Sequence, residues 1–439
     1  MRGRQDDCST ICRKIVQTGH PVFLRAIFIS EEENIVKMDK RKKIFIISIL
    51  IIFMIVSVIW AYLKIFLKIN NKTVEIQASK SEFNTELEEN EHMHIEEDIN
   101  GEKVPVPNGY VGSRADGENG IDTGYVIYEG EEEVTNENVE EAQRTRNQYV
   151  WVPVPDINKF YGIDENGKKW GKLYEFTTET GENVDEITGA RPLNWSESDG
   201  IIKMLYKNRN KEPDIIGNAF DTDSKIGELG KTRHEFLMGI EKEFNDMLES
   251  VEKYGGFYVG RYETGNLSTD KVVIQKGYSD FSLQNWYAMY KKCIDLKGNN
   301  INIETGMIWG NQWDRILMWL VESGNKTKEQ LCNSISWGNY RDSEFEYTNN
   351  DGKVNIKHED SGARIPTGLT EYTKANNIYD LAGNIQEWTM ESNWDNVRVG
   401  RGGFYNGNST TNNSNSRAGY DPSKGQNIIF GCRAMLYIK

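Results

Sequence analysis

An uncharged apolar run near the N-terminus constrains this chain more than any other feature. The twenty residues 44–63 read IFIISILIIFMIVSVIWAYL and contain no Asp, Glu, Lys or Arg. At about 1.5 Å rise per residue, a helix of this length crosses the roughly 30 Å hydrocarbon core of a bilayer. The run therefore predicts one transmembrane anchor.

Basic residues are denser before this run than after it. Those before it are Lys37, Lys40, Arg41, Lys42 and Lys43, and those shortly after it are Lys64, Lys68 and Lys72. By the positive-inside rule, residues 1–43 form a cytosolic basic N-terminus and the C-terminal part lies outside the cytosol. A cleaved signal peptide is the alternative, although residues 61–63 lack a small-x-small cleavage pattern. Met38 stands directly before the basic cluster and is a second candidate for the translation start.

The charge balance of the exported part excludes one class of partner. The first 68 residues contain 12 Lys and Arg against 6 Asp and Glu, so the whole-chain formal charge of −15 leaves about −21 on the remainder. Nucleic acid is an unsuitable partner because phosphate binding needs positive charge. Beyond the anchor only Cys293, Cys332 and Cys432 occur, too few for a disulfide scaffold or a zinc site. A bridge between Cys293 and Cys332 stays open.

Residues 64–104 have the composition of an acidic stalk. The stretch is poor in aromatic residues and rich in Glu, as in TELEENEHMHIEEDINGEK. Such a composition favours a solvated segment over a packed core. His92 and His94 are candidate metal ligands, but no further ligand stands at a useful spacing, so the solvated interpretation is favoured.

The remaining residues, 105–439, predict both strands and helices. Short β-type runs separated by Gly, Asn and Asp occupy 124–130, 148–155 and 255–265 and predict an antiparallel, loop-rich sheet. Two helices are predicted at 286–293 and 312–321.

A third predicted helix has the clearest boundaries. Thr232 and Glu235 form a capping box at its start, and Gly255 ends it. Its apolar face consists of Phe236, Ile240, Phe244, Met247, Leu248 and Val251.

Three motifs follow one another in the last quarter of the chain. They are NNIYDLAGNIQEWT at 376–389, VGRGGFYNGN at 399–408 and FGCRAMLYIK at 430–439. In this order they resemble the closing signature of the formylglycine-generating-enzyme and sulfatase-modifying superfamily. Weaker matches at 255–265, 284–293 and 307–319 agree with it. The resemblance covers about 105–439, apart from an insertion at about 157–250, and implies an α+β domain of the irregular C-type-lectin-like type.

The resemblance also shows which catalytic groups are missing. In the enzyme branch, two cysteines after the Arg-Gly-Gly step bind copper(I), for which soft thiolates are suited. The corresponding positions here are Gly407 and Asn412, and neither has a thiol. A related sulfoxide-synthase branch holds iron with three histidines, whereas beyond the stalk this chain has only His234 and His358. The sequence therefore predicts no copper or iron site and favours a non-catalytic domain.

One calcium site of that superfamily has matching positions in this chain. The matches are Asp380, Gly383, Ile385 and Glu387, two through carboxylates and two through backbone oxygens. Oxygen ligands of this kind suit Ca²⁺. The alternative is that Asp380 and Asn384 are turn residues and that Glu387 is held by an arginine such as Arg401 or Arg433, without metal.

A polar run between two of the motifs is the candidate ligand-binding segment. Residues 406–416 read NGNSTTNNSNS, and short amides and hydroxyls of this kind form an adaptable hydrogen-bonding surface. The run shows no packing role in the sequence. The predicted ligand-binding residues are Phe404, Tyr405, Asn406, Asn408, Asn412, Asn415, Arg417 and Tyr420.

Five tryptophans allow a second interpretation of where a ligand binds. Trp309, Trp313, Trp319, Trp337 and Trp388 could stack on sugars, but aromatic residues in a loop-rich fold more often fill the core. We therefore interpret them as core residues.

Two functions from different classes follow. The first is a membrane-anchored surface protein that binds an unidentified protein or carbohydrate through a non-catalytic C-type-lectin-like domain. The second is a formylglycine-generating-enzyme-type oxidoreductase that acts on an exported protein. The missing thiol pair favours the first.

Overall fold

The computed structural model describes most of the chain after residue 86. The described residues are 87–163, 167, 169–172, 223–268, 271–279, 284–394, 397–423 and 429–439. All of them belong to one compact unit, Ala78–Lys439. Within the described residues, no helix has the length and apolar character that crossing a bilayer requires. The predicted anchor at 44–63 lies outside the described residues.

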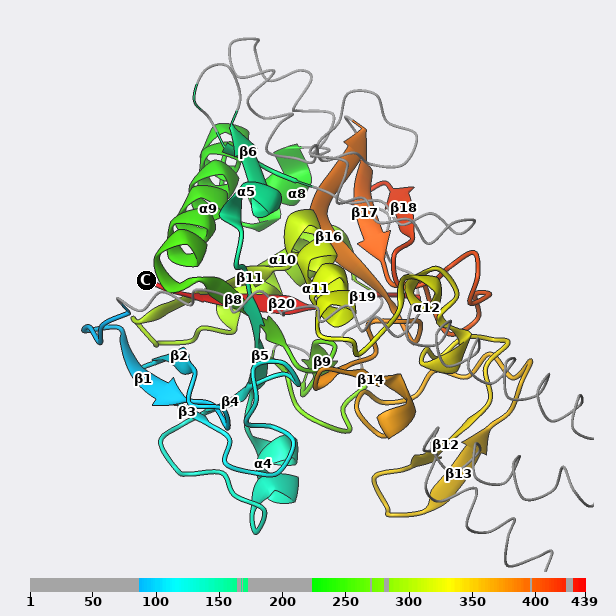
Figure 1. Ribbon diagram of the computed structural model, residues 1–439. Coiled ribbons are helices and arrows are strands. Elements are labelled where there is room, and N and C mark those ends of the chain that lie inside the picture. The colour runs from blue at the N-terminus through cyan, green and yellow to red at the C-terminus, as the bar shows by residue number, and fades with distance from the viewer. Residues whose placement is uncertain are drawn as a thin grey trace, which may run out of the picture. The chain divides into compact units, whose positions relative to one another are not determined.

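A six-stranded antiparallel sheet forms the centre of the fold (Figure 1). The strands are, in spatial order, β11 (Ile303–Met307), β20 (Ala434–Ile438), β8 (Gly256–Gly260), β5 (Gln148–Pro153), β4 (Val126–Glu129) and β3 (Tyr110–Gly112). Strands β4, β5 and β8 fall within the three predicted β-type runs. Every residue of β5, β8 and β20 is buried, and helices α9 (Arg233–Tyr254) and α11 (Gly310–Glu322) contact these strands.

Three long helices, each predicted from the sequence, contact strands of this sheet. They are α9 (Arg233–Tyr254), α10 (Trp286–Asp295) and α11 (Gly310–Glu322). Thr232 caps α9 in a capping box with Glu235, and Gly255 ends the helix at φ 79°. The six predicted apolar side chains of α9 are all buried.

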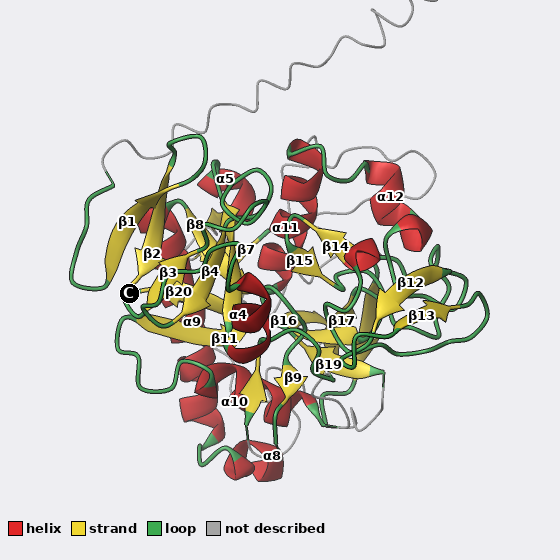
Figure 2. Cartoon of the chain, turned by 90° about the horizontal axis from the view of Figure 1, so that it is seen from below, coloured by secondary structure: helices red, strands yellow, loops and turns green. Residues whose placement is uncertain are grey.

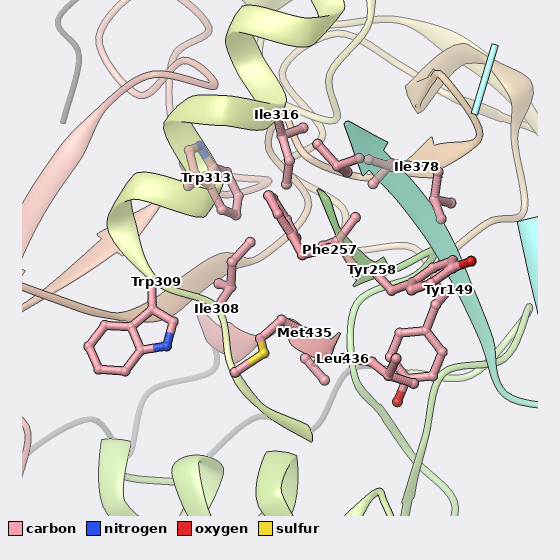
Figure 3. Packing of buried hydrophobic residues seen from close by; sticks show 14 of the residues in the cluster. Tyr149, Phe257, Tyr258, Ile308, Trp309, Trp313, Ile316, Ile378, Met435 and Leu436 are labelled. Atoms are coloured by element: carbon pink, nitrogen blue, oxygen red, sulfur yellow. The ribbon is translucent and has the colours of Figure 1, made fainter. Parts of the chain in front are cut away.

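Helix α11 joins the two sheets through a shared core. It contacts β5 of the central sheet and β16 of the second sheet. Figure 3 shows Trp313 and Ile316 of this helix near Phe257 of β8, within one cluster of buried hydrophobic residues. The five tryptophans Trp309, Trp313, Trp319, Trp337 and Trp388 are each at most 2% exposed, so their interpretation as core residues is confirmed.

Each of the three C-terminal motifs contributes residues to a second sheet, and the last motif continues into β20 of the central sheet. The order of the second sheet is β18 (Arg417–Tyr420), β17 (Val397–Arg401), β16 (Gln386–Trp394) and β19 (Phe430–Cys432). The β16–β19 pair is parallel and the other two pairs are antiparallel. The chain therefore leaves this sheet after β17, returns as β18, and then crosses to the far side of β16.

The folded unit begins earlier than the predicted boundary at residue 105. Strands β1 (Met93–Glu97) and β2 (Lys103–Pro107) form an antiparallel hairpin, and Leu87 and Met93 are buried. The prediction of a solvated stalk is therefore wrong for residues 87–104. The many acidic residues of this segment suggested solvent exposure, but Met93 and Ile95 alternate with polar residues on β1, which pairs with β2.

The two stalk histidines have protein partners. His94 interacts through its ring nitrogens with Asn108 and Glu96, and His92 interacts with Asn302. The hydrogen bond with Glu96 raises the pKa of His94, although burial opposes this. These contacts belong to the hairpin and its neighbours, and no group of three potential metal-ligating side chains occurs in the described part of the chain.

Shorter elements complete the described fold (Figure 2). They are α4 (Val139–Thr145), α5 (Ile157–Phe160), β6 (Tyr161–Ile163), β7 (Lys169–Gly171), α8 (Asp223–Glu228), β9 (Gly265–Asn266), β10 (Val272–Val273), α12 (Lys328–Cys332), β12 (Phe345–Thr348), β13 (Val354–Lys357), β14 (Lys374–Ala375) and β15 (Ile378–Tyr379), with 3-10 turns at Ser334–Ser336 and Glu371–Thr373. Most of the insertion predicted at 157–250, namely 173–222, lies outside the described residues. The mixture of helices and strands agrees with the predicted α+β class.

Candidate functional site

The candidate ligand-binding segment connects two neighbouring strands of the second sheet. It starts with a turn at Gly402 and Gly403, whose φ angles are 82° and 73°. A Cβ atom on Gly403 would lie 1.7 Å from the carbonyl oxygen of Asn412, so only glycine fits. The turn brings the start of the segment against its middle.

Residues 404–412, here called the outer loop, contain the exposed part of the segment. Asn406, Thr410 and Thr411 are exposed. Phe404 and Tyr405 are half-buried, and their rings stand nearly perpendicular with centroids 6.4 Å apart. The outer loop therefore presents two aromatic rings beside short polar side chains.

Hydrogen bonds with two other segments hold the outer loop in place. The backbone N–H of Tyr405 donates to the carbonyl oxygen of Asn384 at 3.0 Å. The carbonyl oxygen of Gly407 accepts from the N–H of Arg341, also at 3.0 Å. The hydroxyl of Ser409 donates to the Asp342 carboxylate at 2.9 Å. The exposed side chains therefore belong to a loop whose position is fixed by hydrogen bonds.

Residues 413–416, here called the inner loop, are packed inside the protein. Asn413, Ser414 and Asn415 are at most 5% exposed. The side-chain amide of Asn413 donates to the carbonyl oxygen of Cys332 at 2.7 Å. Trp313 donates its indole N–H to the Ser414 carbonyl oxygen at 3.0 Å, and the Ser414 hydroxyl donates to the Leu331 carbonyl oxygen at 3.1 Å.

These contacts correct the prediction that the whole polar run lacks a packing role. The inner loop satisfies buried backbone groups at the end of α12 and the N–H of a core tryptophan. Asn415, predicted to bind a ligand, lies here with its amide 3.7 Å from the Cys332 sulfur. A buried side chain of this kind cannot contact a ligand without rearrangement of the loop.

Arg417 and Tyr420 are also placed differently from the prediction. The side chain of Arg417 is 1% exposed and pairs with Glu391 and Asp314. The ring of Tyr420 lies edge-on to Trp388 and Phe430, with centroids 6.0 Å and 4.7 Å away. Burial raises the pKa of the Tyr420 hydroxyl. Both residues contribute to the interior beneath the outer loop.

Two arginines and two acids form a buried network under the segment. Arg401 donates to Asp314 at 2.7 Å and to Glu391 at 3.0 Å, and Arg417 donates to the same two carboxylates. All four side chains are at most 1% exposed. Burial lowers the pKa of Arg401, as does the neighbouring Arg417, while the two carboxylates oppose that shift. The network ties α11 to strands β16, β17 and β18.

One feature of the sequence points to this network. Asp314 and Arg315 are charged residues between apolar ones in the stretch MIWGNQWDRILMW, which includes most of α11. A charged residue within a helix that is buried on nearly all sides needs a partner in the core. Asp314 finds Arg401, which the sequence had suggested as a partner of Glu387 instead.

The predicted calcium loop has its two carboxylates bonded to the protein. One oxygen of Asp380 accepts from the Thr367 hydroxyl at 2.8 Å and from the Gly368 N–H at 3.1 Å. Both oxygens of Glu387 accept from the Arg433 guanidinium, Oε2 at 2.9 Å and Oε1 at 3.1 Å. Burial raises the pKa of Asp380. This donor set does not fit a Ca²⁺ ion, because Arg433 already supplies the positive charge.

The backbone positions of the same loop serve a turn. Asn384 and Asp380 have positive φ angles of 55° and 62°. The Ile385 N–H and the Asn384 amide both donate to Glu263, at 3.1 Å and 2.6 Å. A Cβ atom on Gly383 would lie 2.1 Å from the Asn339 carbonyl oxygen. These contacts favour the alternative in which the loop is a turn and Glu387 is held by an arginine.

The two positions that correspond to the copper-binding cysteines lie side by side. A Cβ atom on Gly407 would be 3.0 Å from the Cβ of Asn412. The positions therefore converge as the resemblance implies, but they carry a hydrogen atom and an amide. His234 and His358 stand on α9 and after β13, far apart in the chain.

Comparisons with known proteins find similar chains among solved structures. No protein-family model matches the chain, and no curated protein matches it. Three solved structures each cover 42% of it: "Treponema denticola variable protein 1" (12% identity, TM-score 0.29, 85% of that chain), "Crystal Structure of CarF" (10%, 0.28, 87%) and "Structure of PvdO from Pseudomonas aeruginosa" (14%, 0.27, 82%). Similarity at this level does not assign a family or an activity to the chain.

Proposed function

We propose that this chain is a membrane-anchored surface protein that binds a protein or carbohydrate ligand through the outer loop of a non-catalytic, C-type-lectin-like domain. One observation supports the proposal most strongly. The outer loop exposes chemically varied side chains, while hydrogen bonds to other segments hold its backbone in place. Aromatic rings flanked by short amides and hydroxyls are typical of surfaces that recognise ligands. A fixed backbone supports this use, because less conformational entropy is lost on binding.

The binding residues of this proposal are fewer than the sequence suggested. They are Phe404, Tyr405, Asn406, Asn408 and Asn412, each exposed or half-buried. Asn415, Arg417 and Tyr420 are assigned to the supporting interior. The three C-terminal motifs support the lectin-like class, and the uncharged run at 44–63 supports the membrane anchor.

A first experiment tests the topology. Intact cells that produce the full chain are treated with protease, and the products are detected with antibodies against residues near each end. We expect loss of the C-terminal domain and retention of an anchored N-terminal fragment. A domain that is cleaved only after lysis would contradict the proposal.

A second experiment tests the binding surface. The purified full chain in detergent is screened against a glycan array and against labelled surface proteins of neighbouring cells. Tyr405→Ala and Asn406→Ala should weaken whichever interaction is found, while Tyr347→Ala and the exposed Asn299→Ala serve as matched controls. Equal binding by the outer-loop variants and the wild type would refute the assignment of this surface.

A further inference from the structure

Strands β12 and β13 form a two-stranded sheet of their own, apart from the two larger sheets (Figure 1). Side chains alternate between the two faces of such a sheet. On one face, Phe345 is buried in a small cluster with Ile365 and Leu369. Lys357 lies on the same face, and its ammonium group donates to the Arg341 carbonyl oxygen at 3.1 Å. The hairpin is therefore anchored to the fold through this face.

The other face of the hairpin is exposed and partly apolar. Val354 and Ile356 of β13 are 60% and 50% exposed. Their cross-strand neighbours on β12 are Thr348 and Glu346, which are exposed as well. Two β-branched apolar side chains therefore lie next to each other on the solvent side of one strand.

The backbone of β12 shows which residues of the hairpin face outward. In an antiparallel pair, residues that bond to the partner strand alternate with residues whose N–H and C=O groups point away from it. Asn349 bonds across the hairpin, because its N–H donates to the Lys353 carbonyl oxygen at 3.0 Å. The next residue back, Thr348, points away from β13, and its N–H donates to the Leu369 carbonyl oxygen at 3.1 Å.

The outward backbone groups of the two strands differ in their partners. Val354 and Ile356 stand opposite Thr348 and Glu346, so their backbone groups point away from β12. On the β12 side, the Glu346 carbonyl oxygen accepts from the Thr370 hydroxyl at 2.7 Å. On the β13 side, no described residue bonds to the outward groups of Val354 and Ile356, and no described strand pairs there. These groups form an unpaired sheet edge, here called the open edge.

The surroundings of the open edge are acidic. Residues 341–360 contain six Asp and Glu but only three Arg and Lys. One of the three is Lys357, whose ammonium group is directed to carbonyl oxygens in the interior. Such an edge attracts a basic partner. The exposed acidic residues are Glu344, Glu346, Asp351, Glu359 and Asp360.

A second copy of this chain fits the open edge poorly. Two antiparallel β13 strands that meet at Asn355 would place Val354 opposite Ile356. The same register would place Asp351 opposite Glu359. Like charges directly opposite each other destabilise a strand pair. The charges therefore favour a different chain as the partner.

We propose that the open edge binds an extended segment of a partner protein in which apolar residues alternate with Lys or Arg. The segment adds a third strand to the hairpin, and its backbone bonds to the outward groups of Val354 and Ile356. Its apolar side chains lie beside these two residues, and its basic side chains reach the surrounding carboxylates. This surface is separate from the outer loop, so the proposal does not depend on the proposed function.

The test measures binding of a short fluorescent peptide, blocked at both ends, in which valine and lysine alternate. The full chain in detergent is titrated into the peptide, and fluorescence anisotropy is recorded. One control peptide carries N-methyl groups on its valine amides, and another has glutamate in place of lysine. We expect each control to bind about tenfold more weakly, because the first loses main-chain donors and the second loses the charge match.

Two variants of the chain locate the binding edge. Ile356→Pro removes an outward N–H without removing a bond to β12, and we expect about tenfold weaker binding of the valine–lysine peptide. Ile356→Lys adds a positive charge at the open edge and should also weaken binding. Ile301→Lys makes the same change at an isoleucine that is 74% exposed elsewhere and should leave binding unchanged. Melting curves check that each variant is folded, and Ile356→Lys decides the matter if Ile356→Pro does not fold.

Three results would overturn the proposal. The first is that the wild type does not bind the valine–lysine peptide, or binds it no better than a control peptide. The second is equal binding by Ile356→Lys and Ile301→Lys. The third is a dimer of the chain, detected by sedimentation, that Ile356→Lys dissociates, because a second copy would then occupy the open edge.

Discussion

The outer and inner loops share a run of short polar residues, but these residues lie in different environments in the two loops. Residues 404–412 place Asn406, Thr410 and Thr411 in solvent, while residues 413–416 bury Asn413 and Ser414 against α12 and Trp313. Asn, Ser and Thr are suited to both roles, because a short polar side chain can hydrogen-bond water, a ligand or a buried backbone group. The difference arises from the partners that the fold supplies. Each prediction below tests one side of this contrast.

The largest expected effect comes from Arg417, which the structure assigns to the interior. Arg417→Ala leaves Asp314 and Glu391 with one arginine instead of two in a fully buried site. Removing one partner of a buried pair typically costs about 3–5 kcal/mol. We expect a loss of this order in chemical denaturation. Arg341→Ala, at a side chain that is 52% exposed, is the control and should change stability little. If both variants were equally stable, Arg417 would be assigned to the binding surface, as the sequence predicted, and not to the interior.

The two tyrosines at the ends of the segment should separate binding from stability. Tyr420→Ala removes a ring that packs against Trp388 and Phe430, and we expect a loss of about 2 kcal/mol in folding stability. Tyr405→Ala should change stability by no more than about 0.5 kcal/mol, as at most surface positions. Chemical denaturation of both variants measures the difference. A Tyr405 variant as unstable as the Tyr420 variant would mean that the outer loop is also core.

The asparagines permit the same comparison with a single residue type. Asn413→Ala leaves the buried Cys332 carbonyl oxygen without the donor amide at 2.7 Å, and we expect a cost of about 1 to 2 kcal/mol. Asn406→Ala, in the exposed half, should cost less than about 0.5 kcal/mol. Melting curves of the two variants under identical conditions are sufficient. If Asn406→Ala cost more stability than Asn413→Ala, the boundary between the outer and inner loops at residue 413 would be wrong.

The sequence predicted the regular elements of this fold better than the environment of its polar residues. The boundaries of α9 follow from a capping box and a terminal glycine, which are local signals. The burial of Ser414 depends on Trp313 and Leu331, which are remote in the chain, and no local pattern encodes them. The same holds for Arg417, whose two acids come from α11 and β16.

The stalk shows that composition can also mislead about order. Its many acidic residues predicted a solvated segment, but Met93 and Leu87 are buried where β1 pairs with β2. In the calcium loop, the resemblance supplied the four ligand positions, while the choice between a metal and an arginine depended on Arg433. That residue stands 46 positions after Glu387.

The smallest expected effect concerns calcium, at the turn beneath the outer loop. This turn contacts the outer loop directly, because the carbonyl oxygen of Asn384 accepts a hydrogen bond from the backbone N–H of Tyr405. A bound ion would stabilise the folded state by mass action and raise the melting temperature. Since both Glu387 oxygens accept from Arg433, we expect added Ca²⁺ to leave the melting temperature unchanged.

The control for the calcium experiment is a variant that removes the carboxylate of Asp380, the other predicted carboxylate ligand. Asp380→Asn preserves an acceptor for Thr367 and Gly368 but removes the charge, so its response to Ca²⁺ should equal that of the wild type. A rise in the wild-type melting temperature that Asp380→Asn abolishes would support the site that the sequence suggested. Such a result would require Arg433 to leave Glu387, and the outer loop would then rest on a metal-bound turn. Ligand binding by the outer loop would then depend on calcium. If Arg433 holds the turn instead, ligand binding is independent of the ion.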